Sequence, residues 1–267
     1  MEKVRVGIVG LGNMGAHHAT YMNSVDGATL GAVCDIDAEL LARIAGKHNV
    51  PGFKTYREMI DSGTVDAVLI AVPHYDHMPM AIDAFAKGLH VLSEKPMAVS
   101  VKAGREAIAA YAKHPNLKFG IMFNQRSNTL YKKMRQVIAD GELGEIQRIT
   151  WIITNWFRTW AYYASGGWRA TWLGEGGGVL INQCPHNLDL IQWVTGMLPK
   201  RVTAVGAVGR YHPIEVEDDS SAILEYDNGA MGHFITTTGE ASGTNRLEVA
   251  GDLVELIAQD GKLGFYR

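Results

Sequence analysis

A glycine-rich turn near the N-terminus is the feature that most limits how this chain can fold. An apolar run over residues 4–9 leads into Gly10, Gly12 and Gly15, which have the spacing GxGxxG, and a segment with a helical pattern follows. A strand, this turn and a helix in that order are typical of the first βαβ unit of a dinucleotide-binding fold. There the first glycine allows a tight turn, the second lets the backbone approach a pyrophosphate, and the third lets the helix pack on the strand.

An acidic residue strengthens this interpretation. A second apolar run, residues 28–34, ends at Asp35, 20 residues beyond Gly15. A carboxylate at this point accepts hydrogen bonds from an adenosine ribose and repels a 2′-phosphate, so the pattern favours NAD over NADP. The alternative is that the glycines only form a turn and that Asp35 only caps a helix over residues 37–47.

Composition excludes several classes of protein. The 267 residues are enough for two domains, and 47% of them are hydrophobic, which allows a sizeable core. A net charge of −3 with scattered basic residues gives no reason to expect a nucleic-acid or membrane partner. The strand pattern starts near residue 4, no apolar run approaches about 18 residues, and Cys34 and Cys184 are the only cysteines. We therefore expect a cytoplasmic protein without a disulfide framework or a metal site.

The hydrophobic pattern predicts an α/β domain over residues 1–124. Short apolar runs alternate there with amphipathic helical stretches, as in βαβ units around a doubly wound parallel sheet. The expected strands are 4–9, 28–34, 66–72, 90–93 and 117–123, and the expected helices are 13–24, 37–47, 77–87 and 100–113.

The pattern changes after that point and predicts an α+β domain over residues 125–267. One helix, 128–140, precedes longer segments in which apolar and polar residues alternate, and Asp227-Asn228-Gly229 and Asp260-Gly261 lie between such segments as hairpin turns. We expect a mostly antiparallel open sheet, with strands at 145–155, 201–209, 219–226, 230–238, 246–250 and 253–258.

Glu94-Lys95-Pro96 is the first candidate for chemistry. The three residues follow a predicted strand, and a residue that precedes proline favours extended backbone. A lysine partly buried beside a cofactor can exchange protons or hydrogen-bond a substrate hydroxyl, and Glu94 would orient it. The alternative is an exposed lysine at a strand end, with Pro96 simply stopping the strand.

His186 is the second candidate. Asn182 lies four residues before it, so the two side chains share one face if the segment is a helix. A neutral imidazole suits the removal of a proton from an alcohol during oxidation. The alternative is a structural histidine that is hydrogen-bonded by Asn182 or Asp189.

Aromatic residues are concentrated between these candidates. Five of the six tryptophans fall within residues 151–172, with arginines and asparagine interleaved. Aromatic faces beside hydrogen-bonding side chains suit a polyol, and Trp168-Arg169 is the preferred substrate pair. The alternatives are sheet core for Trp151 and oligomer contacts for some of the others.

Several motifs, taken in order, resemble the Gfo/Idh/MocA family of NAD(P)-dependent oxidoreductases, typified by glucose-fructose oxidoreductase and inositol dehydrogenase. They cover nearly the whole chain: Gly10 to Gly15 with His18, residues 71–74 with His77, Glu94-Lys95-Pro96, Asn124-Gln125-Arg126, residues 141–146 and residues 176–189.

The resemblance implies hydride transfer between NAD and a secondary hydroxyl of a sugar, sugar derivative or cyclitol, with Lys95 and His186 as the catalytic residues. It implies a homodimer or homotetramer. The expected cofactor contacts are Gly10, Gly12, Asn13, Met14, Gly15, Asp35, Ile36, Val72, Pro73, His74, His77, Glu94 and Lys95. The expected substrate contacts are Arg126, Trp168, Arg169, Asn182 and His186.

The chain departs from the family pattern in two ways. The family often has aspartate where this chain has Asn182, so His186 is a weaker base, Asp189 orients it, or Lys95 carries more of the proton transfer. Family members also usually continue for several tens of residues beyond Arg267. Two other activities fit the same motifs: a redox-dependent glycosidase with tightly held NAD, and a non-catalytic sugar or NAD sensor.

Overall fold

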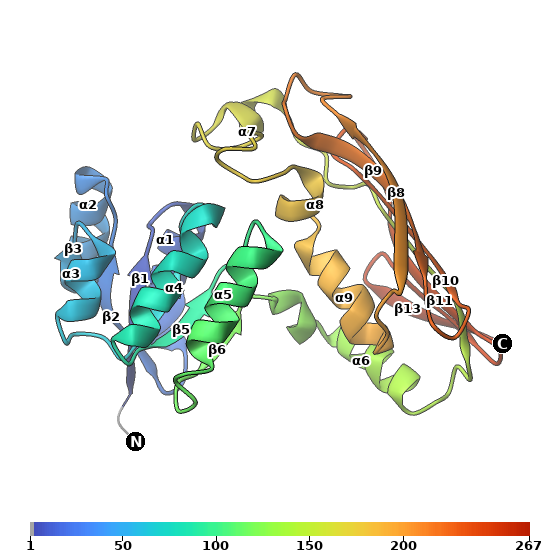
Figure 1. Cartoon of the computed structure of the whole chain (residues 1–267), viewed down its shortest axis with the longest axis horizontal. Helices are drawn as coiled ribbons and strands as arrows, with labels where there is room; N and C mark the ends of the chain where they lie inside the picture. The colour runs from blue at the N-terminus through green and yellow to red at the C-terminus, as the bar shows by residue number, and fades with distance from the viewer. Residues whose placement is uncertain (1–2) are drawn as a thin grey trace. The chain divides into compact units, whose positions relative to one another are not determined.

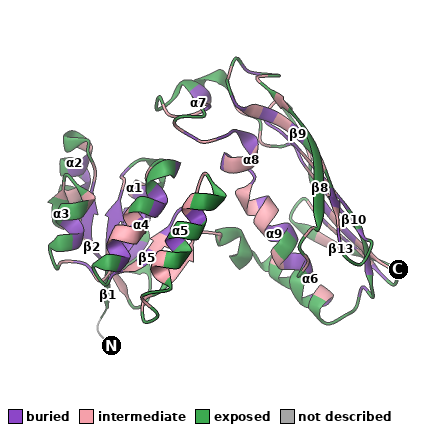
Figure 2. Cartoon of the chain, viewed as in Figure 1, coloured by how far each residue is buried: buried purple, intermediate pink, exposed green. Residues whose placement is uncertain are grey.

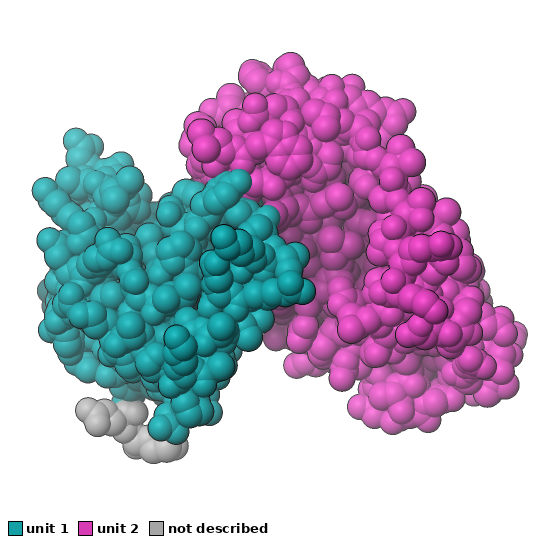
Figure 3. All heavy atoms as spheres, viewed as in Figure 1, with its two compact units in different colours: residues 1–122 teal, residues 123–267 magenta. Residues whose placement is uncertain are grey.

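The computed structural model describes residues 3–267, and the chain divides into two compact units after Met122 (Figure 3). The sequence pattern places the boundary after residue 124. Each unit has its own sheet and its own hydrophobic core.

The first unit is a doubly wound α/β domain, as predicted. Its six strands all pair in parallel, in the order β3-β2-β1-β4-β5-β6 (Figure 1). The strands are β1 (Val4–Val9), β2 (Ala28–Cys34), β3 (Gly52–Phe53), β4 (Ala67–Ile70), β5 (His90–Ser93) and β6 (Phe119–Ile121). The helices are α1 (Asn13–Tyr21), η1 (Met22–Ser24), α2 (Ala38–His48), α3 (Tyr56–Asp61), η2 (His74–Asp76), α4 (His77–Ala86) and α5 (Val101–Tyr111).

Both faces of this sheet are covered by helices, because successive side chains of a strand point to opposite faces. Ile8 and Leu69 belong to one apolar cluster with Leu41 of α2, whereas their neighbours Val9 and Ile70 belong to another with helices α3, α4 and α5. This arrangement explains the nearly continuous apolar strands that the sequence shows.

One strand, one α-helix and one 3₁₀ turn of the first unit were not predicted. They are β3, which has only two residues, α3, which has six, and η2, which has three. A local signal for α3 exists: Thr55 and Glu58 form a capping box, in which each side chain accepts a hydrogen bond from the other's backbone N–H.

The second unit is an α+β domain with a seven-stranded sheet in the order β13-β12-β11-β7-β10-β9-β8. Every pair is antiparallel except β7 with β10, so the expected mostly antiparallel sheet is confirmed. The strands are β7 (Ile146–Ile153), β8 (Arg201–Val208), β9 (Glu217–Glu225), β10 (Met231–Thr237), β11 (Asn245–Gly251), β12 (Glu255–Gln259) and β13 (Lys262–Tyr266).

Helices cover one face of this second sheet (Figures 1 and 2). They are η3 (Asn124–Ser127), α6 (Thr129–Ala139), α7 (Trp160–Ala164), α8 (Val179–Asn182) and α9 (Pro185–Thr195). Trp151 is fully buried in the core and donates to Asn245 Oδ1 at 3.0 Å, so it is a core residue. Within residues 3–267, no helix is both long and apolar enough to cross a bilayer.

Candidate functional site

The three glycines of the first turn have different steric surroundings. Gly10 has a φ of 85°, and a Cβ at Gly15 would lie 1.7 Å from the Gly10 carbonyl oxygen. Within residues 3–267 and apart from its chain neighbours, a Cβ at Gly12 meets no atom within 4 Å. The fold therefore requires glycine at positions 10 and 15, whereas the open space beside Gly12 is available to a ligand.

That space lies at the N-terminus of α1. Gly12 is the N-cap, the helix starts at Asn13, and no side chain among the described residues caps it. Unpaired N–H groups and the helix dipole favour an anion there, so the turn fits the pyrophosphate of a dinucleotide.

Asp35 holds the turn in place. Its Oδ2 accepts a hydrogen bond from Leu11 N at 2.6 Å, and its Oδ1 accepts one from Asp37 N at 2.8 Å. A carboxylate has further lone pairs, which leaves capacity for ribose hydroxyls. The cap of α2 is Asp37, which accepts from Glu39 N and Leu40 N, so the alternative in which Asp35 caps this helix is wrong. Its neighbour Ile36 is 92% exposed.

The loop after β5 is tied to α1 by a buried hydrogen bond between Glu94 and His18. Glu94 Oε1 lies 2.8 Å from His18 Nε2, and His18 Nδ1 lies 2.7 Å from the Tyr21 hydroxyl. Because a carboxylate only accepts hydrogen bonds, His18 Nε2 donates to Glu94. Glu94 Oε2 also accepts from Lys95 N at 3.3 Å. The helix that starts at the glycine turn thus fixes the backbone of Lys95.

The surroundings of Glu94 shift its ionisation. Burial alone would raise the pKa of this carboxyl, but the hydrogen bond and charge of His18 and the charge of Lys95 outweigh it, so the pKa of Glu94 is lowered. Burial, and secondarily the charge of Glu94, raise the pKa of Tyr21. Glu94 is accordingly held as a carboxylate.

Replacing Glu94 by Gln is expected to change the acid stability of the protein. Because the pKa of Glu94 is lower in the folded state, its carboxylate stabilises the fold above the unfolded-state pKa of about 4.3, and this contribution is lost as pH falls through the folded pKa. Wild type should exceed Glu94→Gln in free energy of unfolding at neutral pH, and the gap should narrow below about pH 4.3. Urea titrations at a series of pH values measure this difference in the free energy of unfolding. The exposed Glu106→Gln is the control, and a gap independent of pH contradicts the prediction.

His77 links two loops of the first unit. Its Nδ1 lies 2.8 Å from Pro96 O, and its Nε2 lies 2.8 Å from Val72 O. The side chain is buried, and burial lowers the pKa of His77 despite these two hydrogen bonds. His77 therefore joins the loop after β4, with Val72 and Pro73, to the loop that carries Lys95. His74, in η2, is also buried.

In the second unit, Asn182 and His186 lie on two successive helices. Asn182 is the last residue of α8, Gln183 and Cys184 separate the helices, and Pro185 opens α9. The expectation that both residues share the face of one continuous helix is wrong, because Pro185 starts a new helix at its first position. The ring of His186 contacts Phe123 edge-on, with centroids 6.0 Å apart.

Asp189 pairs with Arg126. Arg126 Nε and Nη2 donate to the two carboxylate oxygens at 2.7 and 2.5 Å, and the guanidinium lies over Phe123 and Trp193. A bidentate pair of this kind fixes the orientation of both side chains. The structure therefore places Arg126, expected at the substrate, in an ion pair with Asp189 inside the second unit.

Three side chains donate hydrogen bonds to the hydroxyl of Tyr162, which was not among the predicted site residues. It accepts hydrogen bonds from Arg169 Nη1 at 2.9 Å, Asn182 Nδ2 at 3.2 Å and Gln183 Nε2 at 3.2 Å. The Arg169 guanidinium also stacks on the rings of Tyr162 and Trp168, 4.6 and 4.7 Å from their centroids. The predicted substrate residues Trp168, Arg169 and Asn182 thus belong to one cluster around Tyr162.

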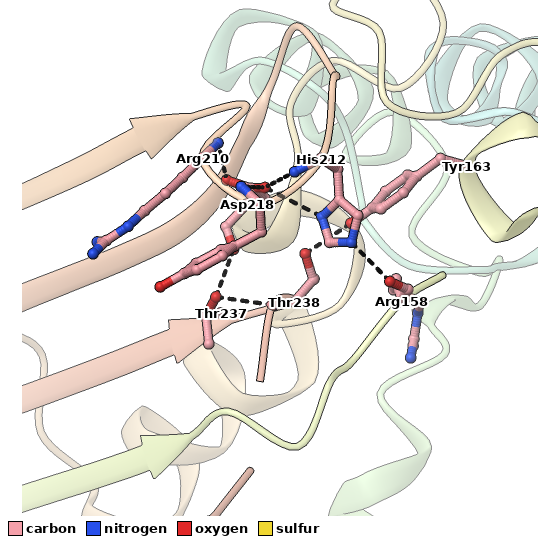
Figure 4. A network of polar contacts seen from close by, with 9 residues as sticks. Arg158, Tyr163, Arg210, His212, Asp218, Thr237 and Thr238 are labelled. Carbon is pink, nitrogen blue, oxygen red and sulfur yellow. Dashed lines mark hydrogen bonds and ion pairs between the residues drawn. The ribbon is translucent and has the colours of Figure 1, made fainter. Parts of the chain in front are cut away.

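A buried polar network holds the segment that carries Tyr162 (Figure 4). The fully buried Asp218 accepts from the backbone N–H groups of Arg210, Tyr211 and His212, and His212 Nε2 lies 2.8 Å from Arg158 O. Tyr163 donates to Thr238 Oγ1 at 2.9 Å. The network anchors both ends of α7 to the sheet.

Glutamates fix the loop between α7 and α8. Glu217 accepts from Gly178 N at 3.0 Å and from Leu180 N at 3.1 Å, and a Cβ at Gly178 would lie 1.9 Å from the Glu217 carbonyl oxygen. Glu175 is buried and accepts from Ala170 N and Asn182 Nδ2. The run Gly176-Gly177-Gly178, directly before α8, was the only sequence signal for this arrangement. Within residues 3–267, no group of three or more His, Cys, Asp or Glu side chains is arranged to hold a metal ion.

Two protein-family models match consecutive parts of the chain. One, described as an oxidoreductase family with an NAD-binding Rossmann fold, matches residues 4–121, and the other, described as the GFO/IDH/MocA C-terminal domain, matches residues 131–256. The chain belongs to the Gfo/Idh/MocA family.

Individual members of the Gfo/Idh/MocA family are moderately similar to this chain. The rhizopine catabolism protein MocA of Rhizobium meliloti is 32% identical over 78% of this chain and 64% of its own length. An inositol 2-dehydrogenase of Corynebacterium glutamicum is 29% identical over 86% of this chain and 66% of its own length. The chain thus spans slightly less than two thirds of these curated relatives.

A solved Gfo/Idh/MocA-like structure matches over the whole chain. It is the WlbA dehydrogenase of Bordetella pertussis in complex with NADH and UDP-GlcNAcA, with a TM-score of 0.91 and 27% identity, covering 100% of this chain and 84% of that chain.

Proposed function

We propose that this protein is an NAD-dependent oxidoreductase that transfers hydride between nicotinamide and a secondary hydroxyl of a sugar, sugar derivative or cyclitol. One observation carries the proposal: helix α1 starts at a turn open to a pyrophosphate, and its His18 holds the Glu94 carboxylate beside Lys95. Cofactor binding and a candidate proton-transfer group thus depend on one helix. The relatives named inositol 2-dehydrogenase and the WlbA structure with NADH and a sugar nucleotide support the same interpretation.

Different residues of the chain would bind the cofactor and transfer the proton. The turn of Gly10, Gly12 and Gly15 would bind the pyrophosphate, and Asp35 would accept from the ribose hydroxyls. The bound nicotinamide supplies the hydride acceptor. His186, assisted by Lys95, would take up the hydroxyl proton as the carbinol carbon loses hydride.

Substrate recognition is assigned to the cluster around Tyr162. Trp168 offers an aromatic face, and the Arg169 guanidinium next to it carries hydrogen-bond donors. This combination suits a polyol, whose C–H face is apolar and whose hydroxyls need partners.

Assembly into a homodimer or homotetramer is part of the proposal. Val202, Val205 and Val208 of β8 are exposed on the sheet of the second unit, with 55%, 76% and 58% of their surface accessible. Light scattering of the purified protein checks the assembly.

Replacing Asp35 by Asn should change the choice between cofactors. The variant keeps an acceptor for Leu11 N but removes the charge that repels a 2′-phosphate, so the preference for NAD over NADP should fall by about 10- to 100-fold. Fluorescence titrations with NADH and NADPH measure the ratio of dissociation constants. Asp37→Asn is the matched control, because asparagine is an equally good N-cap and Asp37 lies at the helix start. An unchanged ratio in Asp35→Asn contradicts the assignment.

A screen of sugars and polyols with NAD and NADP, followed by the absorbance of the reduced cofactor, tests the activity itself. Reduced cofactor that accumulates with a substrate supports a dehydrogenase. Glycoside cleavage without net NADH, or sugar-dependent NAD binding without any turnover, would replace the proposal with the glycosidase or the sensor.

A further inference from the structure

Glu175 is the only acidic residue in the loop between α7 and α8, and the loop encloses it. The side chain is 2% exposed. Around it, Ala170 has a φ of 58° and Gly176 a φ of 83°, and Ala170 N donates to Glu175 Oε2 at 2.7 Å. A non-glycine residue in the left-handed region costs free energy, and so does a buried carboxylate. The loop is therefore shaped around this carboxylate.

The carboxylate determines the orientation of Asn182. Asn182 is 9% exposed, and its Nδ2 donates to Glu175 Oε1. Because a carboxylate only accepts hydrogen bonds, the NH2 group of the amide must face Glu175. The second hydrogen of the same NH2 group is then directed to the Tyr162 hydroxyl oxygen at 3.2 Å.

This orientation in turn determines what the Tyr162 hydroxyl does. Its oxygen accepts from Asn182, Arg169 and Gln183, which saturates its lone pairs. Its own hydrogen must point away from these three donors. Tyr162 is thereby presented as a hydrogen-bond donor.

We propose that Glu175 is a positioning residue that sets the direction of this hydrogen-bond chain, so that Tyr162 donates to an oxygen of the substrate. The proposal rests on the proposed sugar oxidoreductase function and names Tyr162 as a specificity-determining contact. A substrate must place an acceptor oxygen at Tyr162. Glu175 acts only through Asn182 and Tyr162.

A set of variants shows whether Glu175 sets the direction of the hydrogen bonds through Asn182 and Tyr162 or only stabilises the fold. In Glu175→Gln, the NH2 group of the new side chain faces one of the two N–H donors that the carboxylate of Glu175 accepts from. In Asn182→Asp, two buried carboxylates face each other. Each single change should therefore lower the unfolding temperature. The double variant E175Q/N182D restores complementary partners, because the introduced glutamine amide can accept from Ala170 N and donate to the introduced aspartate. That new carboxylate, however, also accepts from the Tyr162 hydroxyl and turns its hydrogen inward, away from the substrate.

We therefore expect E175Q/N182D to regain the unfolding temperature of wild type. Its kcat/KM for the sugar substrate should stay reduced by roughly 10- to 100-fold, because a polar group at a binding contact is left unpaired. Tyr162→Phe should lower kcat/KM by the same factor, and E175Q/N182D in the Tyr162→Phe background should cause no further loss. Glu215→Gln is the control, because Glu215 accepts from Trp172 N on the same loop at 2.7 Å and is exposed. NADH affinity, measured by fluorescence, should be unchanged throughout.

The proposal would be overturned if E175Q/N182D regained kcat/KM as well as the unfolding temperature. It would also be overturned if Tyr162→Phe left kcat/KM unchanged. If wild type oxidises no sugar or polyol, the proposed function falls. In that case the same variants are compared by calorimetric affinity for the sugars that raise the unfolding temperature of wild type. The role of Glu175 is overturned if E175Q/N182D binds these sugars as tightly as wild type. It is also overturned if wild type binds no sugar.

Discussion

Replacing Lys95 by Ala is expected to lower kcat for sugar oxidation by about 10³-fold or more while NADH binding stays measurable. General acid–base groups contribute roughly 10²- to 10⁴-fold, and a lysine on a loop held by Glu94 and His77 is well placed to do so. Single-turnover absorbance measures the rate, and NADH fluorescence measures binding. A Lys95→Ala variant with the rate of wild type would remove Lys95 from the mechanism.

Two further variants sharpen this experiment. Lys95→Arg keeps a positive charge that cannot be lost near neutral pH, so it should stay inactive if Lys95 transfers a proton and should recover activity if only its charge matters. Lys102→Ala is the control, because Lys102 is an exposed lysine at the start of α5, paired with Glu106 at 3.9 Å.

Replacing Gly12 by Ala is expected to weaken cofactor binding strongly without unfolding the protein. A Cβ at Gly12 meets no protein atom within 4 Å, and its φ of −58° is accessible to alanine, so the fold should tolerate the change. The added methyl group occupies the space that a pyrophosphate needs, and NADH affinity should fall by about 100-fold or more, equivalent to roughly 2.7 kcal/mol. Fluorescence titration and thermal unfolding measure the two effects.

Two other glycines are the references for that result. Gly15→Ala should destabilise the fold severely, because its Cβ would lie 1.7 Å from the Gly10 carbonyl oxygen. Gly46→Ala, in α2 with no atom within 4 Å of the new Cβ, should stabilise the protein by about 0.5–1 kcal/mol and leave binding unchanged. NADH affinity retained in Gly12→Ala would rule out the turn as the pyrophosphate site.

Secondary structure followed from local patterns for most of the longer elements, but the 11-residue helix α9 was not among the predicted helices. The strand Val4–Val9, the helix Val101–Tyr111 with its Ser100 cap and the antiparallel strands after residue 145 were predicted close to their observed bounds. β3 was missed because two residues carry no period, and α3 because its main signal is a capping box.

Local reasoning failed at the helix break before His186. The i, i+4 argument assumed one helix from Asn182 to His186, but α8 ends at Asn182 and Pro185 opens a second helix, so the argument does not apply. Asp189 was an open alternative as the partner of His186. Its pairing with Arg126, 63 residues earlier in the chain, could not be read from spacing alone.

By itself, the sequence determined the α/β and α+β classes, the glycine turn with Asp35, and the position of Lys95 after a strand, because backbone sterics and side-chain periodicity are local. Only the tertiary structure showed that His18 holds Glu94, 76 residues away, and that Glu175, Asn182 and Arg169 converge with Tyr162. Those contacts arise from long-range packing, in which buried donors and acceptors must find partners wherever the fold places them.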